Sequence, residues 1–195
     1  MNRAPALVIF LLVFATTAGA AESAALKYGA FDPPRLAPDF ALRGSDGSEL
    51  KLSRYRGKVV ALGFGYTSCP DVCPTTLAEL AQVRKKLGAA AKDFQVVYIT
   101  VDPERDSVEQ MRKYLAAFDS TFIGATGTAQ QLGDVYKAYG ILTTKKMIEG
   151  SKSYFIHHSS SVYLIDSQGR LREMVPFGGR SIDDIARDVK VLLRG

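Results

Sequence analysis

The sequence predicts an α/β fold in which helices flank a central, mixed β-sheet. Three observations support this prediction. Short runs rich in β-branched and aromatic residues, typical of buried strands, alternate along the chain with amphipathic helical segments. A hairpin pattern and a final helical segment follow this alternating part. The composition is that of a globular protein, because 47% of the 195 residues are hydrophobic and 23% are charged.

The first 20 residues indicate an export signal. Arg3 supplies a positive charge, and the apolar or small stretch from Ala6 to Ala20 ends in "AGA", where a signal peptidase would cut. Cleavage is the favoured interpretation, and an uncleaved membrane anchor is the alternative. In both cases we expect the domain to lie outside the cytoplasm, in the periplasm or facing outward, where disulfides persist.

Residues 21–37 are predicted to form a flexible tether, because prolines crowd the second half of this segment. Residues 38–195 are predicted to form a single domain, for which the chain is long enough to build one well-formed core.

The predicted domain begins with an N-terminal β-hairpin extension from Phe40 to about Ser53, whose turn is indicated by Asp46-Gly47. The near-continuous apolar run from Lys58 to Tyr66 predicts a buried central strand. A helix follows up to Leu87, and Pro74 is expected at its first position, where a helix tolerates proline best.

Alternating elements continue through the middle of the chain. The run from Phe94 to Asp102 predicts a second buried strand, and Ser107–Phe118 predicts an amphipathic helix that begins with the spacing of a capping box. A short strand over residues 121–127 precedes a helix from Ala129 to Tyr139, which Gly140 is expected to end.

A polar stretch, Thr143–Lys152, interrupts the pattern. The segment over residues 161–177 then predicts an antiparallel hairpin around a Gln168-Gly169 turn, and Ser181–Leu193 predicts a closing amphipathic helix. This order of strands and helices is the thioredoxin-like arrangement, in which the reactive thiols lie between the first strand and the first helix.

The chain has two cysteines, Cys69 and Cys73, and they lie at that junction. They could form a structural disulfide, act as a redox dithiol, or bind a metal together with a third ligand. A bridge between such close residues closes a small loop and stabilises little, which disfavours a purely structural role. The amides and dipole of a helix N-terminus favour a thiolate at Cys73, which suits the other two roles.

The two histidines, His157 and His158, lie just before the strand segment "SVYLID". In a thioredoxin-like fold the loop entering this strand faces the cysteine turn, and ordinary thioredoxins carry a cis-proline that is absent from this loop. A histidine there can reach both sulfurs. Two thiolates and an imidazole suit Cu(I), for which three ligands suffice, whereas zinc would require a fourth ligand or water. A structural or surface histidine is the alternative.

Three segments together resemble the Sco/SenC family: "GKVVALGFGYTSCPDVCPTTLAEL", "VDPERDS" and "HHSSSVYLIDSQG". The resemblance extends from about residue 38 to the C-terminus. It implies a thioredoxin-like protein that binds Cu(I) and Cu(II) through Cys69, Cys73 and His158. Asp usually precedes the ligand histidine in the family, whereas this sequence has His157, a spare or competing ligand.

The resemblance further implies a copper metallochaperone that acts in cytochrome c oxidase assembly. We expect it to be a monomer and, because copper transfer needs no covalent turnover, not an enzyme. Its expected partner is the binuclear copper site of oxidase subunit II or another copper-accepting protein. The alternative function is a thiol-disulfide oxidoreductase that reduces the acceptor's cysteines with the Cys69–Cys73 dithiol, whose reversible disulfide we expect. Scattered Lys and Arg residues argue against nucleic-acid binding. The acids of "VDPERD" (Asp102–Asp106) are expected to turn the chain, and "GFG" lacks the spacing of a phosphate loop.

Overall fold

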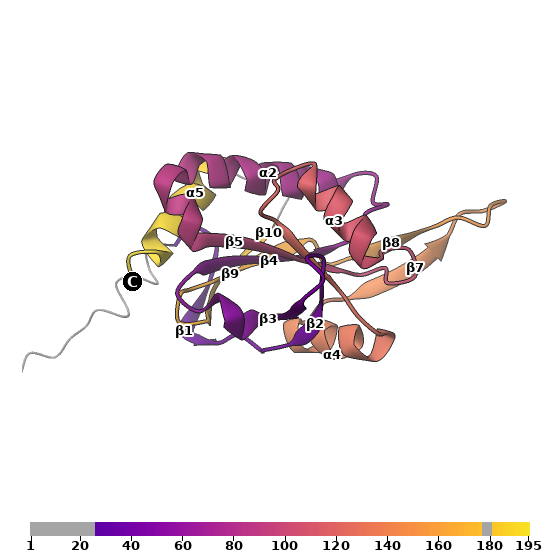
Figure 1. Ribbon diagram of the computed structural model, residues 1–195, viewed down its shortest axis with the longest axis horizontal. Coiled ribbons are helices and arrows are strands. Elements are labelled where there is room, and N and C mark those ends of the chain that lie inside the picture. Colours follow the sequence, from indigo (N-terminus) through magenta and orange to yellow (C-terminus); the bar gives the residue numbers. More distant parts are fainter. Residues whose placement is uncertain (1–25, 177–180) are drawn as a thin grey trace, which may run out of the picture.

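The computed structural model describes residues 26–176 and 181–195, in which a large mixed sheet is covered by helices on both faces (Figure 1). Its eight strands have the order β1-β10-β9-β4-β5-β6-β2-β3. Their bounds are β1 Gly29–Leu36, β2 Ala41–Gly44, β3 Glu49–Lys51, β4 Val59–Gly65, β5 Phe94–Thr100, β6 Ile123–Thr126, β9 Ser161–Ile165 and β10 Arg170–Pro176. Strands β4, β5 and β6 are parallel, and the other pairings are antiparallel. The predicted α/β class and mixed sheet are confirmed.

The centre of the sheet explains the two apolar runs in the sequence. Strand β4 lies between β5 and β9, and every residue of β4 and of β5 is buried. A strand covered on both faces cannot alternate between apolar and polar residues. The residue that follows β4 is therefore held firmly, and the cysteine turn begins there.

Three helices lie on one face of the sheet, and α4 lies on the other (Figure 1). The three are α2 (Val72–Leu87), α3 (Val108–Ala116) and α5 (Ile182–Leu192), and α4 spans Ala129–Tyr139. Two short 3-10 helices, Leu52–Tyr55 and Gly88–Asp93, connect strands and helices.

Helix ends follow the local chemistry of the sequence. The Ser107 side chain accepts a hydrogen bond from the Gln110 backbone N–H at the start of α3, as its spacing predicts. Gly140 ends α4 with a φ of +68°, a left-handed conformation that glycine adopts without steric cost. Helix α2 differs from its prediction because it begins at Val72, which makes Pro74 its third residue. Pro74 is still in the first turn, where backbone N–H groups lack helical partners.

The tether prediction is wrong for residues 29–36, because they form the edge strand β1. The pairing of β1 with β10 shifts register between Ala30 and Arg35, and the two adjacent prolines, Pro33 and Pro34, lie inside this irregular segment. Proline is tolerated at edges and bulges of a sheet, because no ladder hydrogen bond is lost there. The proline-rich composition therefore concealed a strand.

A second strand pair was also missed from sequence. Residues 143–147 form β7 (Thr143–Met147), which pairs antiparallel with β8 (Tyr154–His158). This β7–β8 hairpin projects from the body of the molecule (Figure 1). Every residue of β7 is exposed, so the strand leaves no alternating pattern in the sequence.

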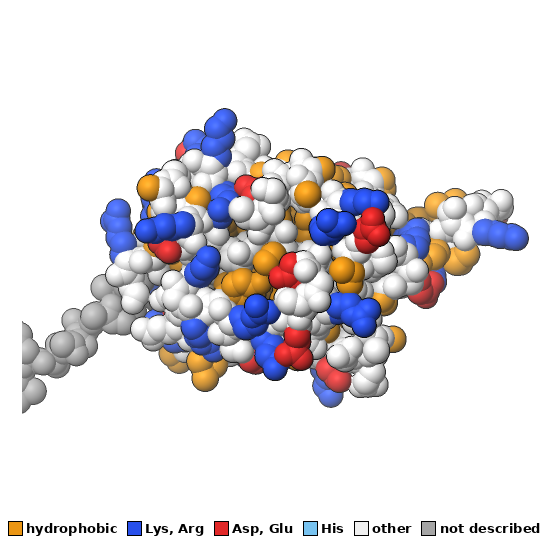
Figure 2. All heavy atoms as spheres, viewed as in Figure 1, with side chains coloured by type: hydrophobic (Ala, Val, Ile, Leu, Met, Phe, Trp, Pro, Cys, Tyr) orange, Lys and Arg blue, Asp and Glu red, His pale blue; other side chains and the backbone are white. Residues whose placement is uncertain are grey.

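The predicted export signal (residues 1–20) and the first part of the predicted tether lie outside the described residues. None of the helices in the described ranges combines the length and the apolar character needed to cross a bilayer. Lys and Arg side chains are spread over the visible face and interspersed with acidic ones, as the scattered charges in the sequence indicate (Figure 2).

Candidate metal centre

The two cysteines lie on the turn that joins β4 to α2. Both thiols are free; Cys73 is buried and Cys69 is half-buried. Cys69 precedes the helix, and its backbone N–H donates to the Tyr66 carbonyl at 3.3 Å. Cys73 is the second residue of α2. The turn thus presents one accessible sulfur and one buried sulfur.

No side-chain oxygen caps the N-terminus of α2. The sulfur of Cys69 instead accepts hydrogen bonds from the backbone N–H groups of Asp71 and Cys73. These donors and the positive end of the helix dipole favour a negative charge on that sulfur. The helix start therefore stabilises a thiolate.

The sulfurs form a coupled pair. A hydrogen bond from the Cys73 thiol to the Cys69 sulfur lowers the pKa of Cys69, and burial opposes this effect only in part. The same hydrogen bond, together with burial, raises the pKa of Cys73. Negative charge is therefore favoured on the accessible Cys69 sulfur over the buried Cys73 sulfur.

His158, the last residue of β8, completes the group. Its Nε2 lies 3.3 Å from the Cys73 Sγ, and the ligand atoms of Cys69, Cys73 and His158 all lie within 4.8 Å of one another. The two segments are 85 residues apart in the sequence. The expected meeting of this histidine with the cysteine turn is confirmed.

The tautomer of His158 follows from its second ring nitrogen. Nδ1 lies 2.9 Å from the Ser159 backbone carbonyl, which can only accept, so Nδ1 carries the hydrogen. Nε2 then has a free lone pair directed at the sulfurs. The Ser159 carbonyl thus orients the ring, and the structure needs no carboxylate at position 157 for this purpose.

His157 points away from the cysteines. It is exposed, and its ring packs against Phe155 at a centroid distance of 4.9 Å. Neighbouring side chains alternate across a strand, and Phe155 and His157 share the outer face of β8. Only His158 can therefore join the group in this arrangement.

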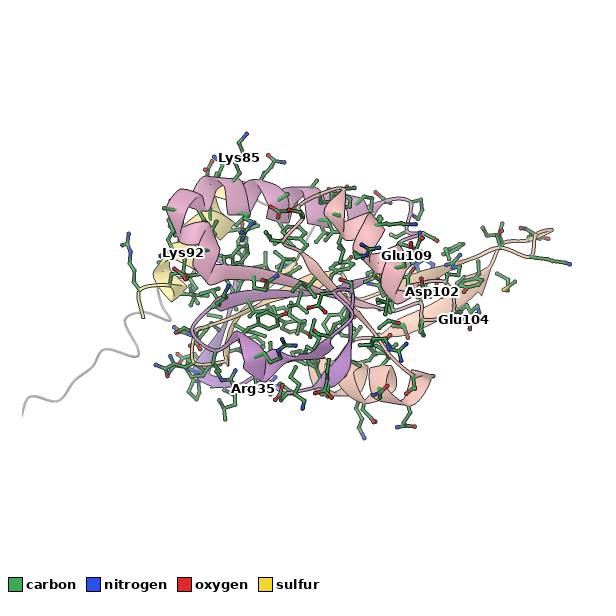
Figure 3. All side chains as sticks on the ribbon, in the orientation of Figure 1. Arg35, Lys85, Lys92, Asp102, Glu104 and Glu109 are labelled. Atoms are coloured by element: carbon green, nitrogen blue, oxygen red, sulfur yellow. The ribbon has the colours of Figure 1, made fainter. Side chains whose placement is uncertain are left out.

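Arg105 anchors the histidine-bearing hairpin to the body. It is ion-paired with Asp102, its guanidinium lies 3.8 Å from the centre of the Tyr154 ring, and it donates to the Tyr154 carbonyl at 3.1 Å. The Tyr154 hydroxyl donates in turn to Asp102 at 2.9 Å. Asp102 and Glu104 lie beside the base of the hairpin (Figure 3), where Glu104 is paired with Lys145 at 2.7 Å.

Asp106 holds the start of the cysteine turn. Its buried carboxylate accepts hydrogen bonds from the hydroxyls of Thr67 and Thr100, both at 2.6 Å, and from the Thr67 backbone N–H. Burial raises the pKa of Asp106. The segment 102–106, expected only to turn the chain, therefore holds both ligand-bearing segments, through Asp102 and Arg105 on one side and Asp106 on the other.

Tyr66 is a further residue that sequence reasoning missed. Its hydroxyl accepts a hydrogen bond from the Ile156 backbone N–H at 3.1 Å, and its ring lies 6.0 Å from the His158 ring. A tyrosine directly after a buried strand and three residues before a cysteine was the available signal. Its role depends on β8, which the sequence did not reveal.

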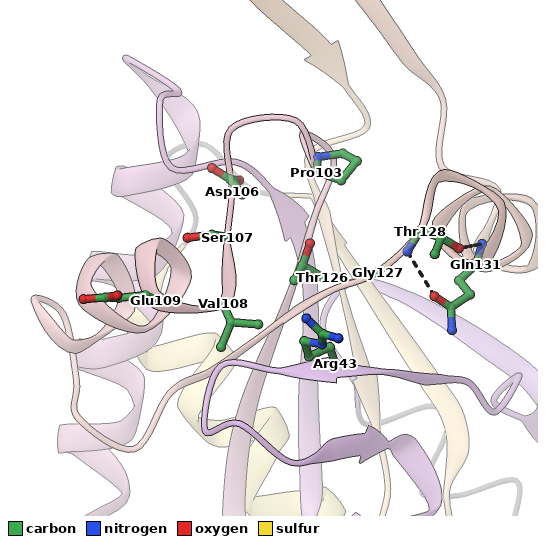
Figure 4. A pocket seen from close by; sticks show the side chains of 10 residues that line it. All are labelled: Arg43, Pro103, Asp106, Ser107, Val108, Glu109, Thr126, Gly127, Thr128 and Gln131. Atoms are coloured by element: carbon green, nitrogen blue, oxygen red, sulfur yellow. Dashed lines mark hydrogen bonds between the residues drawn. The ribbon is translucent and has the colours of Figure 1, made fainter.

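A cleft of about 680 Å³ lies beside this group, not at it (Figure 4). It is lined by Arg43, Pro103, Asp106, Ser107, Val108, Glu109, Thr126, Gly127, Thr128 and Gln131, which include none of the three candidate ligands. Figure 4 shows that Thr128 and Gln131, at its edge, are engaged in the capping box of α4. The candidate metal centre therefore lies outside this cleft.

The donor atoms fit a soft ion of low coordination number. Two sulfurs and one neutral imidazole nitrogen converge, and within the described residues no other group of three or more His, Cys, Asp or Glu side chains could hold a metal. Thiolate and imidazole ligands suit Cu(I), which accepts three ligands.

Comparison with known proteins places these features in context. The profile of the SCO1/SenC family matches residues 30–194. An SCO2-like protein of Rickettsia conorii is 34% identical over 142 residues, which cover 71% of this chain and 68% of that protein.

Solved structures of Sco proteins are similar to this structure. Bradyrhizobium japonicum ScoI with copper bound has a TM-score of 0.73 and 32% identity, and the match covers 80% of this chain and 99% of that one. BsSco, a member of the Sco family of cytochrome c oxidase assembly proteins in which a disulfide switch was identified, has a TM-score of 0.66 and 25% identity, with 86% of this chain and 98% of that one covered. The thioredoxin-like prediction is confirmed by these matches.

Proposed function

The chain belongs to the SCO1/SenC family, and from this premise we propose that it is a copper metallochaperone. It binds one copper ion through Cys69, Cys73 and His158 and passes the ion to a copper-accepting protein during cytochrome c oxidase assembly. The observation that supports this most strongly is the convergence of two sulfurs and one imidazole nitrogen within 4.8 Å. Copper is the cargo, and no covalent turnover is needed, so the protein is not an enzyme.

The burial of the three ligands indicates the order in which they release copper. Cys73 is 1% exposed, whereas Cys69 and His158 are half-buried. An incoming thiolate of the acceptor can reach the copper on the side of Cys69 and His158, where these two ligands are replaced first. Cys73 then releases the ion last. The proposed acceptor is the binuclear copper site of oxidase subunit II, as the family resemblance implies.

Copper titration of the reduced protein tests the proposal. We expect one Cu(I) per chain, and loss of tight binding in Cys69→Ala, because one thiolate and one imidazole hold the ion poorly. A suitable control is His157→Ala, which changes an exposed side chain near the site and leaves the three donors in place. Wild-type affinity in Cys69→Ala would contradict the proposal.

The second candidate function is reduction of the acceptor's disulfide, which the lowered pKa of the accessible Cys69 favours. The Cys69 thiolate would attack one acceptor sulfur and release the other as a thiolate. Cys73, after losing its proton, would then attack the Cys69 sulfur and release the acceptor's first sulfur as a thiolate, so that two electrons pass to the acceptor and Cys69–Cys73 becomes the disulfide. Oxidised protein should not take up Cu(I). Cys73→Ser tests this second function, because the variant traps the mixed disulfide with the acceptor if exchange takes place.

The proposed place of action is outside the cytoplasm, because residues 1–20 predict an export signal. Fractionation of cells that produce the full chain, with a cytoplasmic marker as the control, checks this location. Release of the protein with the cytoplasmic marker would contradict it.

A further inference from the structure

Tyr98 is a buried tyrosine whose hydroxyl reaches the metal centre from inside the protein. It lies on β5 and is 1% exposed. Its hydroxyl forms a hydrogen bond with the Cys73 sulfur. The phenol hydroxyl carries a hydrogen and the sulfur offers lone pairs, so Tyr98 acts as the donor.

Strand β4 leaves the space that this contact needs. Gly63 is the parallel-sheet partner of Tyr98, and a methyl group on Gly63 would come within 2.8 Å of the Tyr98 ring. A methyl group on Gly65 would overlap the Tyr98 hydroxyl and come within 2.8 Å of the Cys73 Sγ. The hydroxyl and the sulfur thus share the space beside one glycine α-carbon. These close approaches explain why glycine stands at both ends of the "GFG" segment, which lacks the spacing of a phosphate loop.

A hydroxyl in this position requires a polar partner. Burying an unpaired hydroxyl costs free energy, and phenylalanine would fill the same space without that cost. Two other buried tyrosines in the core donate to backbone carbonyls, Tyr139 to Pro38 at 2.7 Å and Tyr163 to Tyr139 at 2.5 Å. Tyr98 differs from them because its partner is a candidate ligand sulfur.

We infer that Tyr98 is a positioning residue of the copper site, which fixes the Cys73 sulfur and tunes its bond to copper by donating a hydrogen bond to it. This inference rests on the proposed function. Its basis in the structure is the phenol–sulfur hydrogen bond and the two glycines that make room for it.

The hydrogen bond changes how strongly the Cys73 sulfur donates electrons to copper. A donated hydrogen bond draws electron density toward the proton, so the thiolate donates less strongly to the metal. Cu(II) depends more on that donation than Cu(I), and hydrogen bonds around a cysteine sulfur therefore tune the potential of a copper site. Tyr98 should favour Cu(I) over Cu(II) and shift the sulfur-to-Cu(II) charge-transfer band to higher energy.

Tyr98→Phe removes the hydroxyl and keeps the ring. We expect the charge-transfer band to move to lower energy, the Cu(II)/Cu(I) potential to fall, and the Cu(I) dissociation constant to rise about tenfold, because a charge-assisted hydrogen bond is lost. The matched control is Tyr139→Phe, which also removes a buried hydroxyl but one bonded to the Pro38 carbonyl. The control should lose comparable stability and keep the wild-type spectrum and potential.

Unchanged spectrum and potential in Tyr98→Phe would overturn the inference, even if the variant were less stable, because only packing would then be affected. If wild-type protein bound no copper, the proposed function itself would fail, so the two failures are distinguishable.

Wild-type protein offers a second measurement if Tyr98→Phe does not fold. With tyrosines selectively labelled, NMR of the reduced protein should show a Tyr98 hydroxyl proton that exchanges slowly with solvent and shifts when Cu(I) is added. A proton that exchanges like that of a free phenol, or that does not respond to Cu(I), would equally overturn the inference.

Discussion

The two adjacent histidines have different surroundings at the scale of single residues. His158 directs Nε2 at the Cys73 sulfur at 3.3 Å, and the Ser159 carbonyl fixes its ring. His157 lies on the opposite face of β8 and packs against Phe155. The resemblance to the Sco/SenC family selects His158 from the sequence, and the pleat of the strand separates the two side chains in the structure.

Alanine substitutions test this separation. His158→Ala should abolish the Cu(II) charge-transfer spectrum and weaken Cu(I) binding about 100-fold or more, because it removes a direct ligand. His157→Ala, the control, should leave both properties nearly unchanged. The measurements are Cu(II) absorption and competition titration with a Cu(I) chelator. A larger loss in His157→Ala would mean that the register of β8 differs by one residue.

Glu173 on β10 is a buried carboxyl far from the metal centre. Burial, together with the nearby charge of Asp188 on α5, raises its pKa to about 7, although it accepts a hydrogen bond from the Tyr28 backbone N–H. The folded state therefore binds this proton more tightly than the unfolded state. Its stabilising contribution is complete below the unfolded pKa of about 4.5 and is lost as the pH rises through about 7.

Glu173→Gln should flatten this pH dependence. Urea unfolding should give similar stabilities for variant and wild type near pH 5, and a more stable variant at pH 8, by about 1–3 kcal/mol. The control is Glu109→Gln, which changes an exposed carboxyl paired with Lys113 and should leave the stability nearly unchanged at both pH values. A variant less stable than wild type at pH 8 would contradict the assignment.

At the scale of elements, the metal centre joins two independent pieces of structure. The cysteine turn belongs to the rigid β4–α2 junction, whereas His158 belongs to the projecting β7–β8 hairpin. The hairpin is paired only within itself in the sheet topology of the described residues. Its position therefore depends on side-chain contacts, chiefly those that Arg105 makes with Asp102 and Tyr154.

Arg105→Gln should loosen the hairpin. It removes the ion pair with the buried Asp102 and the contact with the Tyr154 ring, which should cost about 2–3 kcal/mol of stability. The Cu(I) dissociation constant should rise, since ordering the hairpin would then oppose binding. Arg112→Gln, which changes an exposed arginine of the following helix α3, is the control. Equal copper affinity in Arg105→Gln and wild type would show that the hairpin needs no such anchor.

At the scale of the whole molecule, the first described residues belong to the folded domain. Strand β1 pairs with β10, and just before it the Lys27 backbone N–H donates to the Asp188 carboxylate at 3.0 Å. Leu26 is part of the hydrophobic core. A boundary at residue 38, as the sequence suggests, would therefore remove part of the sheet.

A chain that begins at residue 38 should be less stable than one that begins at residue 26, by about 2 kcal/mol or more, because it loses buried apolar surface and ladder hydrogen bonds. It should also aggregate more readily, since the edge of β10 becomes exposed. Thermal unfolding and light scattering measure both effects. Equal stability of the two chains would show that residues 26–37 do not stabilise the domain, as expected of a tether.

The sequence by itself determined the elements whose signals are local. Buried central strands appear as continuous apolar runs, as in β4 and β5, and helix starts and ends appear as capping residues such as Ser107 and Gly140. The position of the thiols at a strand-to-helix junction is local too, as is the order of strands and helices that identifies the fold class. The choice of His158 as the third ligand rested on the resemblance to the Sco/SenC family.

Only the tertiary structure decided what depends on contacts between distant segments. The edge strand β1 and the exposed strand β7 lack a periodic pattern, because neither has a fully buried face. The orientation of His158, the anchoring by Arg105 and the approach of Tyr98 to Cys73 all join residues far apart in the chain. Their hydrogen bonds are set by how β8 and β5 lie beside the cysteine turn, which no local preference specifies.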